Sequence, residues 1–309
     1  MTNDLVCCRV GGDLYALTHD DVRSVARADA VRLERGADGR VGTLAFAGAA
    51  VPVYRLSARL GCGDHAASAD RHVVITRGDG EPFGLLVDHI NRTRVAEDER
   101  IQPLPSIVGA LASSRFAGLV PLGDVLCLVL SPSAIDPIGP RAYTPSDRAA
   151  ADAAATAAVR SAAADLALIF STDAIPRRER TRYALNAKRV VALVQALPSI
   201  AVPGAAPFVA AVGWWRRSVV PILDFRRADA RAAAAGSTRY LIARCGAPLG
   251  RALVAFATGA DLTLHRATAD DRLITEGIFG IGREPVALLD LDRLVAEAES
   301  PHGSGARRI

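Results

Sequence analysis

Histidines, cysteines and paired carboxylates supply most enzymatic and metal chemistry, and their spacing in this 309-residue chain matches none of the common sites. The six histidines form no HxH or HExxH pattern and the five cysteines form no CxxC pair, which are the spacings that hold a metal. Asp88 and His89 are adjacent, but neighbouring residues on a strand point to opposite faces and do not share a site without a bulge. The Asp-Asp pairs at 20–21 and 270–271 are typical of solvated charges. The sequence therefore predicts no catalytic residue, no cofactor and no metal site.

One glycine-rich stretch, "GIFGIG" at 277–282, superficially has the form of a dinucleotide-binding loop. That loop requires a surrounding βαβ unit, whereas this stretch lies in a predicted hairpin, so turns and a bulge explain its glycines better. The phosphate-binding form G-x-x-x-x-G-K-[ST] does not occur. An enzyme whose site is assembled from distant residues stays open as a third hypothesis, and it requires a deep pocket lined by polar groups.

Charge and hydropathy narrow the class of protein further. The formal net charge is +4, Lys188 is the sole lysine, and the arginines are scattered, whereas a phosphate-binding face needs clustered cations. No stretch approaches the roughly 18 apolar residues of a membrane span, and the start "MTNDLVCCRV" lacks the basic and apolar regions of a signal peptide. We expect a cytoplasmic protein with no direct membrane insertion and no nucleic-acid partner.

The elements that must position any functional residue are short strands joined by tight turns. "LVCCRV" and "LYAL" flank Gly11-Gly12, and "GLVPL" and "VLCLVL" flank Gly123-Asp124, which is typical of β-hairpins. Short helices are predicted only after the last strand of each half, beginning near Pro132 and at Asp290. Small antiparallel barrels are the natural way to close so many short strands without leaving edges, so the predicted class is all-β.

The second half of the chain repeats the first. "YALTHDDVRSVARA" at 15–28 matches "YALNAKRVVALVQA" at 183–196 without a gap, and "VPVYRLSARLG" at 51–61 returns as "VPILDFRRADA" at 220–230. Between the copies, the alanine-rich segment 139–164 predicts a linker helix, with an unstructured tether as the alternative. The predicted organisation is therefore a domain at 1–138, the linker, a domain at 165–299 and a disordered tail at 300–309.

Together these motifs resemble the CheW-like domain of chemotaxis coupling proteins. The first copy has the marks of that family in the family's order over roughly 4–136: "VPVYRLSARLG", "RHVVIT", "FGLLVDHI", "IQPLP" and "FAGLVPLGDVLCLVL". The second copy, about 166–298, is degenerate, because it lacks the Pro-Leu-Pro segment and has Ala255 where the first copy has Asp88. The resemblance implies two tandem CheW-like domains, each built of two SH3-like five-stranded β-barrels.

The resemblance also implies a function without catalysis. Such domains are adaptors that couple the cytoplasmic tip of chemoreceptors to the regulatory domain of a histidine kinase, in the cytoplasm beside membrane receptor arrays. An SH3-like β-barrel adaptor for nucleic acid or ribonucleoprotein is the alternative. Arginines that converge on one groove beside exposed aromatic side chains would favour that alternative.

Candidate partner-binding residues follow from how the Val-Pro strand continues. The family typically has Asp-Leu-Arg there; the first copy has Arg55-Leu56-Ser57, and the second keeps both charges in Asp224-Phe225-Arg226. We therefore expect the two copies to have divided the family's surface, although Asp224 and Arg226 could instead pair with each other and only solvate an edge. The tryptophan pair before the second Val-Pro strand could supply an exposed anchor, or both indoles could be covered. The predicted partner-binding residues are Asp224, Arg226, Trp214, Trp215, Arg55 and Asp88.

Overall fold

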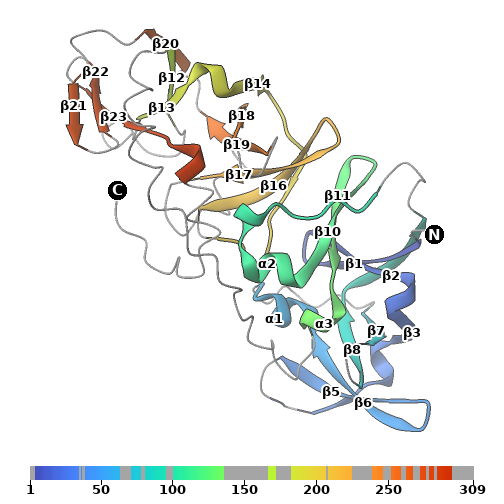
Figure 1. The fold of residues 1–309 in the computed structure, drawn as a ribbon. Helices are drawn as coiled ribbons and strands as arrows, with labels where there is room; N and C mark the ends of the chain where they lie inside the picture. The colour runs from blue at the N-terminus through green and yellow to red at the C-terminus, as the bar shows by residue number, and fades with distance from the viewer. Residues whose placement is uncertain are drawn as a thin grey trace, which may run out of the picture. The chain divides into compact units, whose positions relative to one another are not determined.

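The computed structural model is mostly β-structure, arranged in four sheets with a few short helices (Figure 1). The structure describes residues 4–34, 36, 39–62, 71–77, 81–94, 100–135, 166–171, 182–206, 208–224, 239–245, 252–258, 262–266, 272–275, 278–281 and 284–293. The predicted linker at 139–164 and tail at 300–309 lie outside these residues. Among the described residues, no helix has the length and apolar character that crossing a membrane requires.

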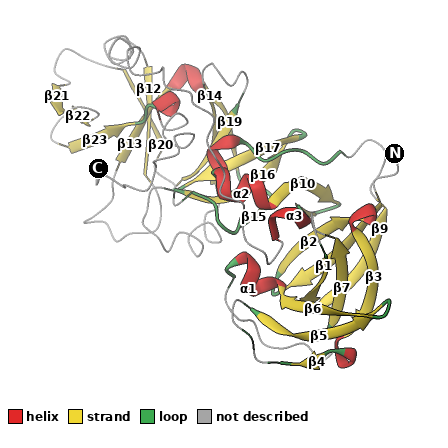
Figure 2. Ribbon diagram, turned by 60° about the horizontal axis from the view of Figure 1, so that its bottom comes forward, coloured by secondary structure: helices red, strands yellow, loops and turns green. Residues whose placement is uncertain are grey.

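Internal contacts divide the chain into two units, of which unit 1 takes up most of the chain as far as Thr144 and unit 2 most of the remainder. Unit 1 holds a five-stranded sheet and a six-stranded sheet, whose strands curve strongly in Figure 2. In spatial order the first sheet contains β10 (Phe116–Leu122), β11 (Val125–Leu130), β2 (Asp13–Thr18), β1 (Asp4–Val10) and β9 (His89–Arg94). The second contains β3 (Val22–Arg27), β7 (His72–Arg77), β8 (Pro82–Val87), β6 (Ala49–Arg55), β5 (Arg40–Phe46) and β4 (Arg32–Leu33).

Unit 2 repeats both sheets. Its counterpart of the first sheet contains β22 (Ile278–Ile281), β23 (Glu284–Leu288), β13 (Arg182–Asn186), β12 (Leu166–Ser171) and β20 (Leu262–Arg266), and β21 (Arg272–Thr275) adds a sixth strand beside β22. Its counterpart of the second sheet contains β14 (Val190–Val194), β18 (Arg239–Arg244), β19 (Leu253–Thr258), β17 (Ser218–Leu223), β16 (Val209–Trp215) and β15 (Ser199–Ile200). The strand orders therefore agree throughout, while the five strands predicted per sheet are too few for three of the four sheets.

The registers of the two units agree as closely as their strand orders. In unit 1 the parallel pair β11–β2 places Leu128 opposite Tyr15, and in unit 2 the parallel pair β23–β13 places Ala287 opposite Tyr183. The β3–β7 pair has a bulge after Val22 and the β14–β18 pair has one after Val190, the residues that the sequence repeat aligns. A bulge bends a strand and increases its twist, so matching bulges give the two sheets matching curvature.

One residue correspondence expected from sequence is wrong. Ala255 lies opposite Ile222 on β17, in the place that Gly84 holds opposite Val53 on β6, so its counterpart is Gly84 and not Asp88. The error arose because the loop between β7 and β8 and the loop between β18 and β19 differ in length, which moves the register of the strand that follows.

Apolar residues on alternate positions form the core of each sheet. The second sheet of unit 1 buries Leu44, Val51, Val53, Val73, Ile75 and Leu86, and its counterpart in unit 2 buries Leu197, Ala211, Val220, Ile222, Tyr240, Ile242, Ala255 and Ala257. Fully burying a Val, Leu or Ile side chain stabilises the fold by about 1.5–3 kcal/mol relative to leaving it exposed.

The helices are short and close the sheets. In α1 (Leu56–Leu60) both terminal leucines are buried, and the helix ends because Gly61 adopts the left-handed conformation, with φ of 72°, that glycine tolerates best. The other helices among the described residues are α2 (Ala110–Arg115), α3 (Pro132–Ile135), η1 (His19–Asp21), η2 (Ala28–Ala30), η3 (Ser106–Val108) and η5 (Ala187–Arg189). The predicted start at Pro132 is confirmed, and so is the predicted cap, because the Asp290 carboxylate accepts hydrogen bonds from the N–H groups of Asp292 and Arg293.

Candidate functional site

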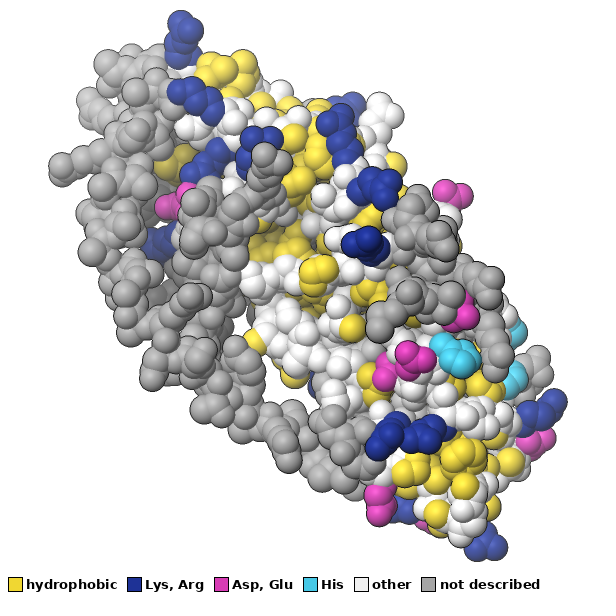
Figure 3. All heavy atoms as spheres, turned by 45° about the vertical axis from the view of Figure 1, so that its right-hand side comes forward, with side chains coloured by type: hydrophobic (Ala, Val, Ile, Leu, Met, Phe, Trp, Pro, Cys, Tyr) yellow, Lys and Arg dark blue, Asp and Glu magenta, His cyan; other side chains and the backbone are white. Residues whose placement is uncertain are grey.

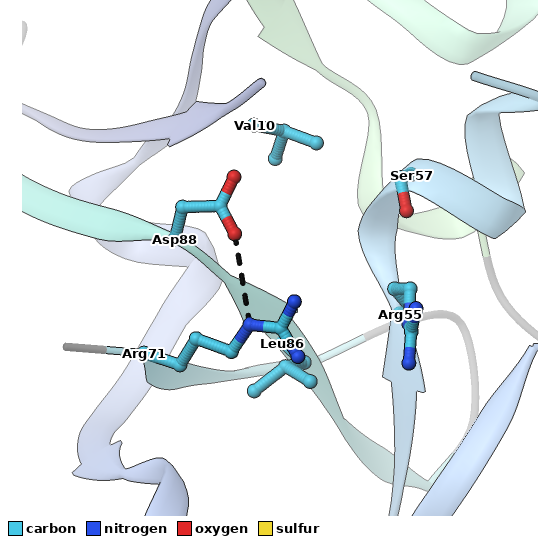
Figure 4. A pocket seen from close by; sticks show the side chains of 6 residues that line it. All are labelled: Val10, Arg55, Ser57, Arg71, Leu86 and Asp88. Carbon is cyan, nitrogen blue, oxygen red and sulfur yellow. Dashed lines mark ion pairs between the residues drawn. The ribbon is translucent and has the colours of Figure 1, made fainter. Parts of the chain in front are cut away.

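Two of the predicted partner-binding residues, Arg55 and Asp88, line one small pocket of unit 1 (Figure 4). Residues from four separate segments meet there: Val10, Arg55, Ser57, Arg71, Leu86 and Asp88. Arg55 ends β6, Ser57 belongs to α1 and Asp88 follows β8, so the site lies where strands of both sheets end. In Figure 4 the Asp88 carboxylate points toward Arg71, while Arg55 and Ser57 lie across from it on β6 and α1.

Asp88 is held in place from three directions. Its backbone N–H donates to the Arg9 carbonyl at 3.0 Å, and its carboxylate accepts from the Gly11 N–H at 2.9 Å. The other carboxylate oxygen lies 3.8 Å from Nε of Arg71, and both side chains are about one-fifth exposed. Asp88 therefore ties the β1–β2 turn to the segments before β7 and after β8, and it keeps Arg71 at the edge of the pocket. Sequence reasoning missed Arg71, although an arginine directly before the "HVVIT" strand was a visible signal.

The opposite wall is set by the end of the Val-Pro strand. The Arg55 N–H donates to the Gly39 carbonyl at 2.9 Å, and the side chain is half-buried. Ser57 is only 4% exposed, and its carbonyl accepts from the Cys62 N–H at 2.8 Å, which closes the end of α1. Arg59, one turn further, lies over the Tyr54 ring with 5.8 Å between its guanidinium carbon and the ring centroid.

The size and charge of the pocket limit what it can do. It has room for about one water molecule, which excludes it as a small-molecule active site. Two guanidinium groups and one carboxylate line the pocket, so its rim is charged.

A larger hollow of about 360 Å³ lies elsewhere in unit 1. Its lining consists of Thr18, Asp20, Asp21, Arg77, Ala117, Leu130, Ser131, Pro132 and Ser133. Two carboxylates, those of Asp20 and Asp21, line this hollow. The Thr18 hydroxyl donates to the Asp21 carboxylate at 2.5 Å, so Asp21 has a hydrogen-bond partner within the hollow. Within the described part of the chain, no group of three or more His, Cys, Asp or Glu residues could hold a metal ion.

The buried thiols are not poised for nucleophilic chemistry. A hydrogen bond with Cys7 is the main cause that raises the pKa of Cys127, and burial raises it further. Burial is also the main cause that raises the pKa of Cys8. A raised pKa keeps a thiol protonated, whereas the thiolate is the nucleophile and the metal ligand. Both cysteines behave as small apolar residues of the core.

The remaining predicted site residues belong to unit 2. Asp224 is only 2% exposed and its N–H donates to the Phe208 carbonyl at 2.9 Å, as the N–H of Arg55 does to Gly39 in unit 1. Its carboxylate therefore offers almost no surface to a partner in this conformation. Arg226 lies outside the described residues.

The two tryptophans differ in their surroundings. Trp215 packs against the unit 2 core and is capped by the Arg216 guanidinium, 4.6 Å from the ring centroid, while Trp214 donates its backbone N–H to Pro198. Both side chains are half-buried. Sequence reasoning missed Arg216, and the signal that could have found it is a turn that reads Arg-Arg where Asn-Gly is usual.

Comparison with known proteins decides the family. The model of the CheW-like domain matches residues 4–136. The chemotaxis protein CheW of Rhizobium meliloti is 30% identical over 129 residues, which cover 41% of this chain and 83% of that protein. The chain belongs to the CheW-like family.

Two further CheW proteins each resemble about two-fifths of the chain. A probable chemotaxis protein CheW of Rhizobium etli is 25% identical over 128 residues, with 41% of this chain and 83% of that protein covered. A crystal structure of the scaffolding protein TtCheW from Thermoanaerobacter tengcongensis is 24% identical, covers 42% of this chain and 90% of that chain, and has a TM-score of 0.38. CheW-like proteins are non-enzymatic adaptors, and the family match ends before unit 2.

Proposed function

We propose that this protein is a scaffold that couples chemoreceptor tips to the regulatory domain of a chemotaxis-type histidine kinase in the cytoplasm. The family match over residues 4–136 carries the proposal. The pocket around Asp88 supports it, because its charged rim suits a protein surface while its small volume does not suit a substrate. Binding would require neither a nucleotide nor a metal.

We also propose that unit 2 is a second, degenerate CheW-like domain at 165–299, separated from the first at 1–138 by the 139–164 linker. Its support is the repeated strand order, the repeated parallel pairs and the bulge at Val190. Two linked domains raise the effective concentration of the second contact, so modest individual affinities would suffice for stable incorporation into an assembly. In this proposal Arg226, Trp214 and Trp215 face a partner of unit 2.

Binding of the full chain to a purified kinase regulatory domain and to a soluble receptor tip tests the function. Arg55→Glu and Arg226→Glu should each weaken one of these interactions by about tenfold or more if they are central contacts. Ser57→Glu is unsuitable, because Ser57 is buried and the new carboxylate would test folding.

Arg27→Glu is the matched control. It changes the charge by the same amount as the two site substitutions, but on the edge strand β3, where the Arg27 side chain is 76% exposed. Parent-like binding by both site variants would reject these residues and leave the function standing. Failure of the parent chain to bind either the kinase or the receptor would reject the function itself.

A further inference from the structure

The hairpin between β16 and β17 has an unusual turn. Trp215 pairs with Ser218, which leaves Arg216 and Arg217 as the two turn residues, with φ of 48° and 65°. A two-residue hairpin turn needs positive φ at these positions, and Asn-Gly is the usual choice because side chains disfavour that conformation.

Other hairpins of this chain solve the same problem with glycine. The corresponding turn of unit 1, between β5 and β6, is Ala47-Gly48, with φ of 48° and 82°. The described turns of β1–β2 and β10–β11 likewise contain Gly11 and Gly123 at positive φ. The Arg-Arg turn is therefore a departure from the chain's own pattern, and it costs stability rather than adding to it.

What the turn gains is one oriented cation with a second beside it. Arg216 stacks on the Trp215 ring at 4.6 Å, and Trp215 is itself anchored on the unit 2 core. Both arginines are exposed. An exposed cation–π contact is a weak stabiliser, so it does not account for two left-handed arginines, but it does hold one guanidinium in a set direction. A cation oriented before binding loses less entropy when a ligand arrives.

The surroundings indicate an anionic ligand. On the face shown in Figure 3, Lys and Arg side chains predominate among the described residues of unit 2, whereas unit 1 presents both signs and histidines. The exposed basic residues of unit 2 include Lys188, Arg239, Arg244 and Arg266. Such cations attract acidic partners over distance, while the oriented Arg216 and its neighbour Arg217 provide the short-range contact.

The chemistry favours carboxylates of a protein over nucleic acid. Guanidinium groups bind carboxylates through two parallel hydrogen bonds. A single-stranded nucleic acid needs aromatic faces on which bases stack, and the Trp215 face is occupied by Arg216. We propose that the β16–β17 turn, with Arg216 held on Trp215 beside Arg217, is a docking point for an acidic segment of a partner protein. This site shares Trp215 with the surface proposed for unit 2 but no residue with the Asp88 pocket, so its failure would leave the coupling function proposed for unit 1 standing.

Fluorescence anisotropy of a labelled octaglutamate peptide titrated with the full chain tests the proposal. The double variant Arg216→Asn/Arg217→Gly installs the usual turn and removes both cations. It should weaken peptide binding by about tenfold or more, and it should melt roughly 2–5 °C higher than the parent because strain is relieved. Trp215→Phe keeps the apolar anchor with a poorer stacking partner and should weaken binding by a smaller factor.

The matched control is Arg239→Gln/Arg244→Gln, which removes the same charge from exposed positions of unit 2 while leaving the turn intact. Binding within about twofold of the parent is expected for this control. If the two double variants lost equal amounts of peptide affinity, the overall positive charge of unit 2 would explain the binding without the turn, and the proposal would be overturned. A lower melting temperature of the turn variant would assign the arginines a structural role, and tighter, turn-dependent binding of an oligothymidylate of equal charge would assign them to nucleic acid.

Discussion

Units 1 and 2 pair their strands in the same order and with matching bulges, yet they fill those sheets with different side chains. On neighbouring strands of unit 1, Val73 lies opposite Leu86, whereas the matching pair of unit 2 is Tyr240 opposite Ala257. The larger residue has moved from one strand to the other. Exchange of volume between neighbours preserves packing density, and cores tolerate such exchange far better than a net gain or loss.

A second exchange involves a loop residue. Leu44 of unit 1 is buried opposite Val51, while unit 2 has Gly213 opposite Val220. A Cβ atom on Gly213 would lie 2.6 Å from the Leu197 side chain, so Leu197 occupies the space that the strand residue leaves. The two exchanges show that the topology depends on where side-chain volume and bulges lie, and less on which residue supplies them. The surfaces of the two units are therefore free to diverge.

The largest expected effect comes from Gly42→Ala in unit 1. A Cβ atom there would lie 2.1 Å from the Arg32 carbonyl oxygen, so the backbone of β4 must move, and we expect a loss of about 3 kcal/mol in the free energy of unfolding. The counterpart in unit 2 is Ala211, which lies opposite Ile222 as Gly42 lies opposite Val53, so unit 2 already accommodates a Cβ atom at this position. Ala211→Gly should therefore cost only about 1 kcal/mol.

The two tryptophans allow each unit to be followed separately, because both lie in unit 2. In urea unfolding, Gly42→Ala should move part of the circular dichroism transition to lower urea while the tryptophan fluorescence transition stays in place. A fluorescence transition that moves by the same amount would show that the units unfold as one, against the proposed separate domains.

A smaller effect is expected at alkaline pH in unit 2. Burial raises the pKa of Cys245 from its ordinary 9.0 to about 11, with Asp292 adding to the shift and Arg189 opposing it. The folded state thus favours the protonated thiol, so this stabilisation is complete below pH 9 and is lost as the pH rises through about 11. The loss should be on the order of 2 kcal/mol.

Urea unfolding followed by tryptophan fluorescence between pH 8 and 11 measures this loss, with Cys245→Ala as the comparison. Burial also raises the pKa of Tyr240, so the parent and the variant should both weaken, the parent more steeply. Parallel curves for the two proteins would show that the Cys245 thiol does not contribute.

The smallest effect concerns an ion pair of unit 2. Arg189 and Asp292 form two hydrogen bonds of 2.9 Å and 2.6 Å, and this pairing raises the pKa of Arg189. The sequence repeat aligns them with Asp21 and Ser133, which line the larger hollow of unit 1. Since both side chains of the pair are at least one-third exposed, Asp292→Asn should cost only about 0.5–1 kcal/mol, and less in high salt.

The exposed pair Arg27–Asp29 is the reference for that measurement. Its side chains are 76% and 70% exposed, so Asp29→Asn should leave the melting temperature unchanged. Equal effects of the two substitutions would mean that bidentate geometry adds nothing to the Arg189–Asp292 pair.

Local chemistry made part of this fold predictable from sequence. Glycine turns such as Gly11-Gly12 and Gly123-Asp124 mark hairpins because few other residues adopt positive φ, and both hairpins are confirmed. Helices such as α1 were missed, since five residues are too few to show a helical period. Burial of Asp224 was not foreseeable either, because a charged residue at the end of a strand is normally exposed to solvent. For the site, the family motifs predicted Arg55 and Asp88 from the sequence. Only the structure shows that Arg71 lies in the same pocket and pairs with Asp88.

The parallel pairing of β2 with β11 has a consequence for synthesis on the ribosome. An early strand of unit 1 waits for the last one, Val125–Leu130, before its sheet can close, and in unit 2 β13 waits in the same way for β23 at Glu284–Leu288. At roughly 5–20 residues per second, the second closing strand emerges about 8–30 s after the first. Small β-domains fold within milliseconds to seconds, so unit 1 has closed before β23 exists. Two sheets of identical strand order would otherwise be able to exchange their closing strands, and vectorial translation separates them in time.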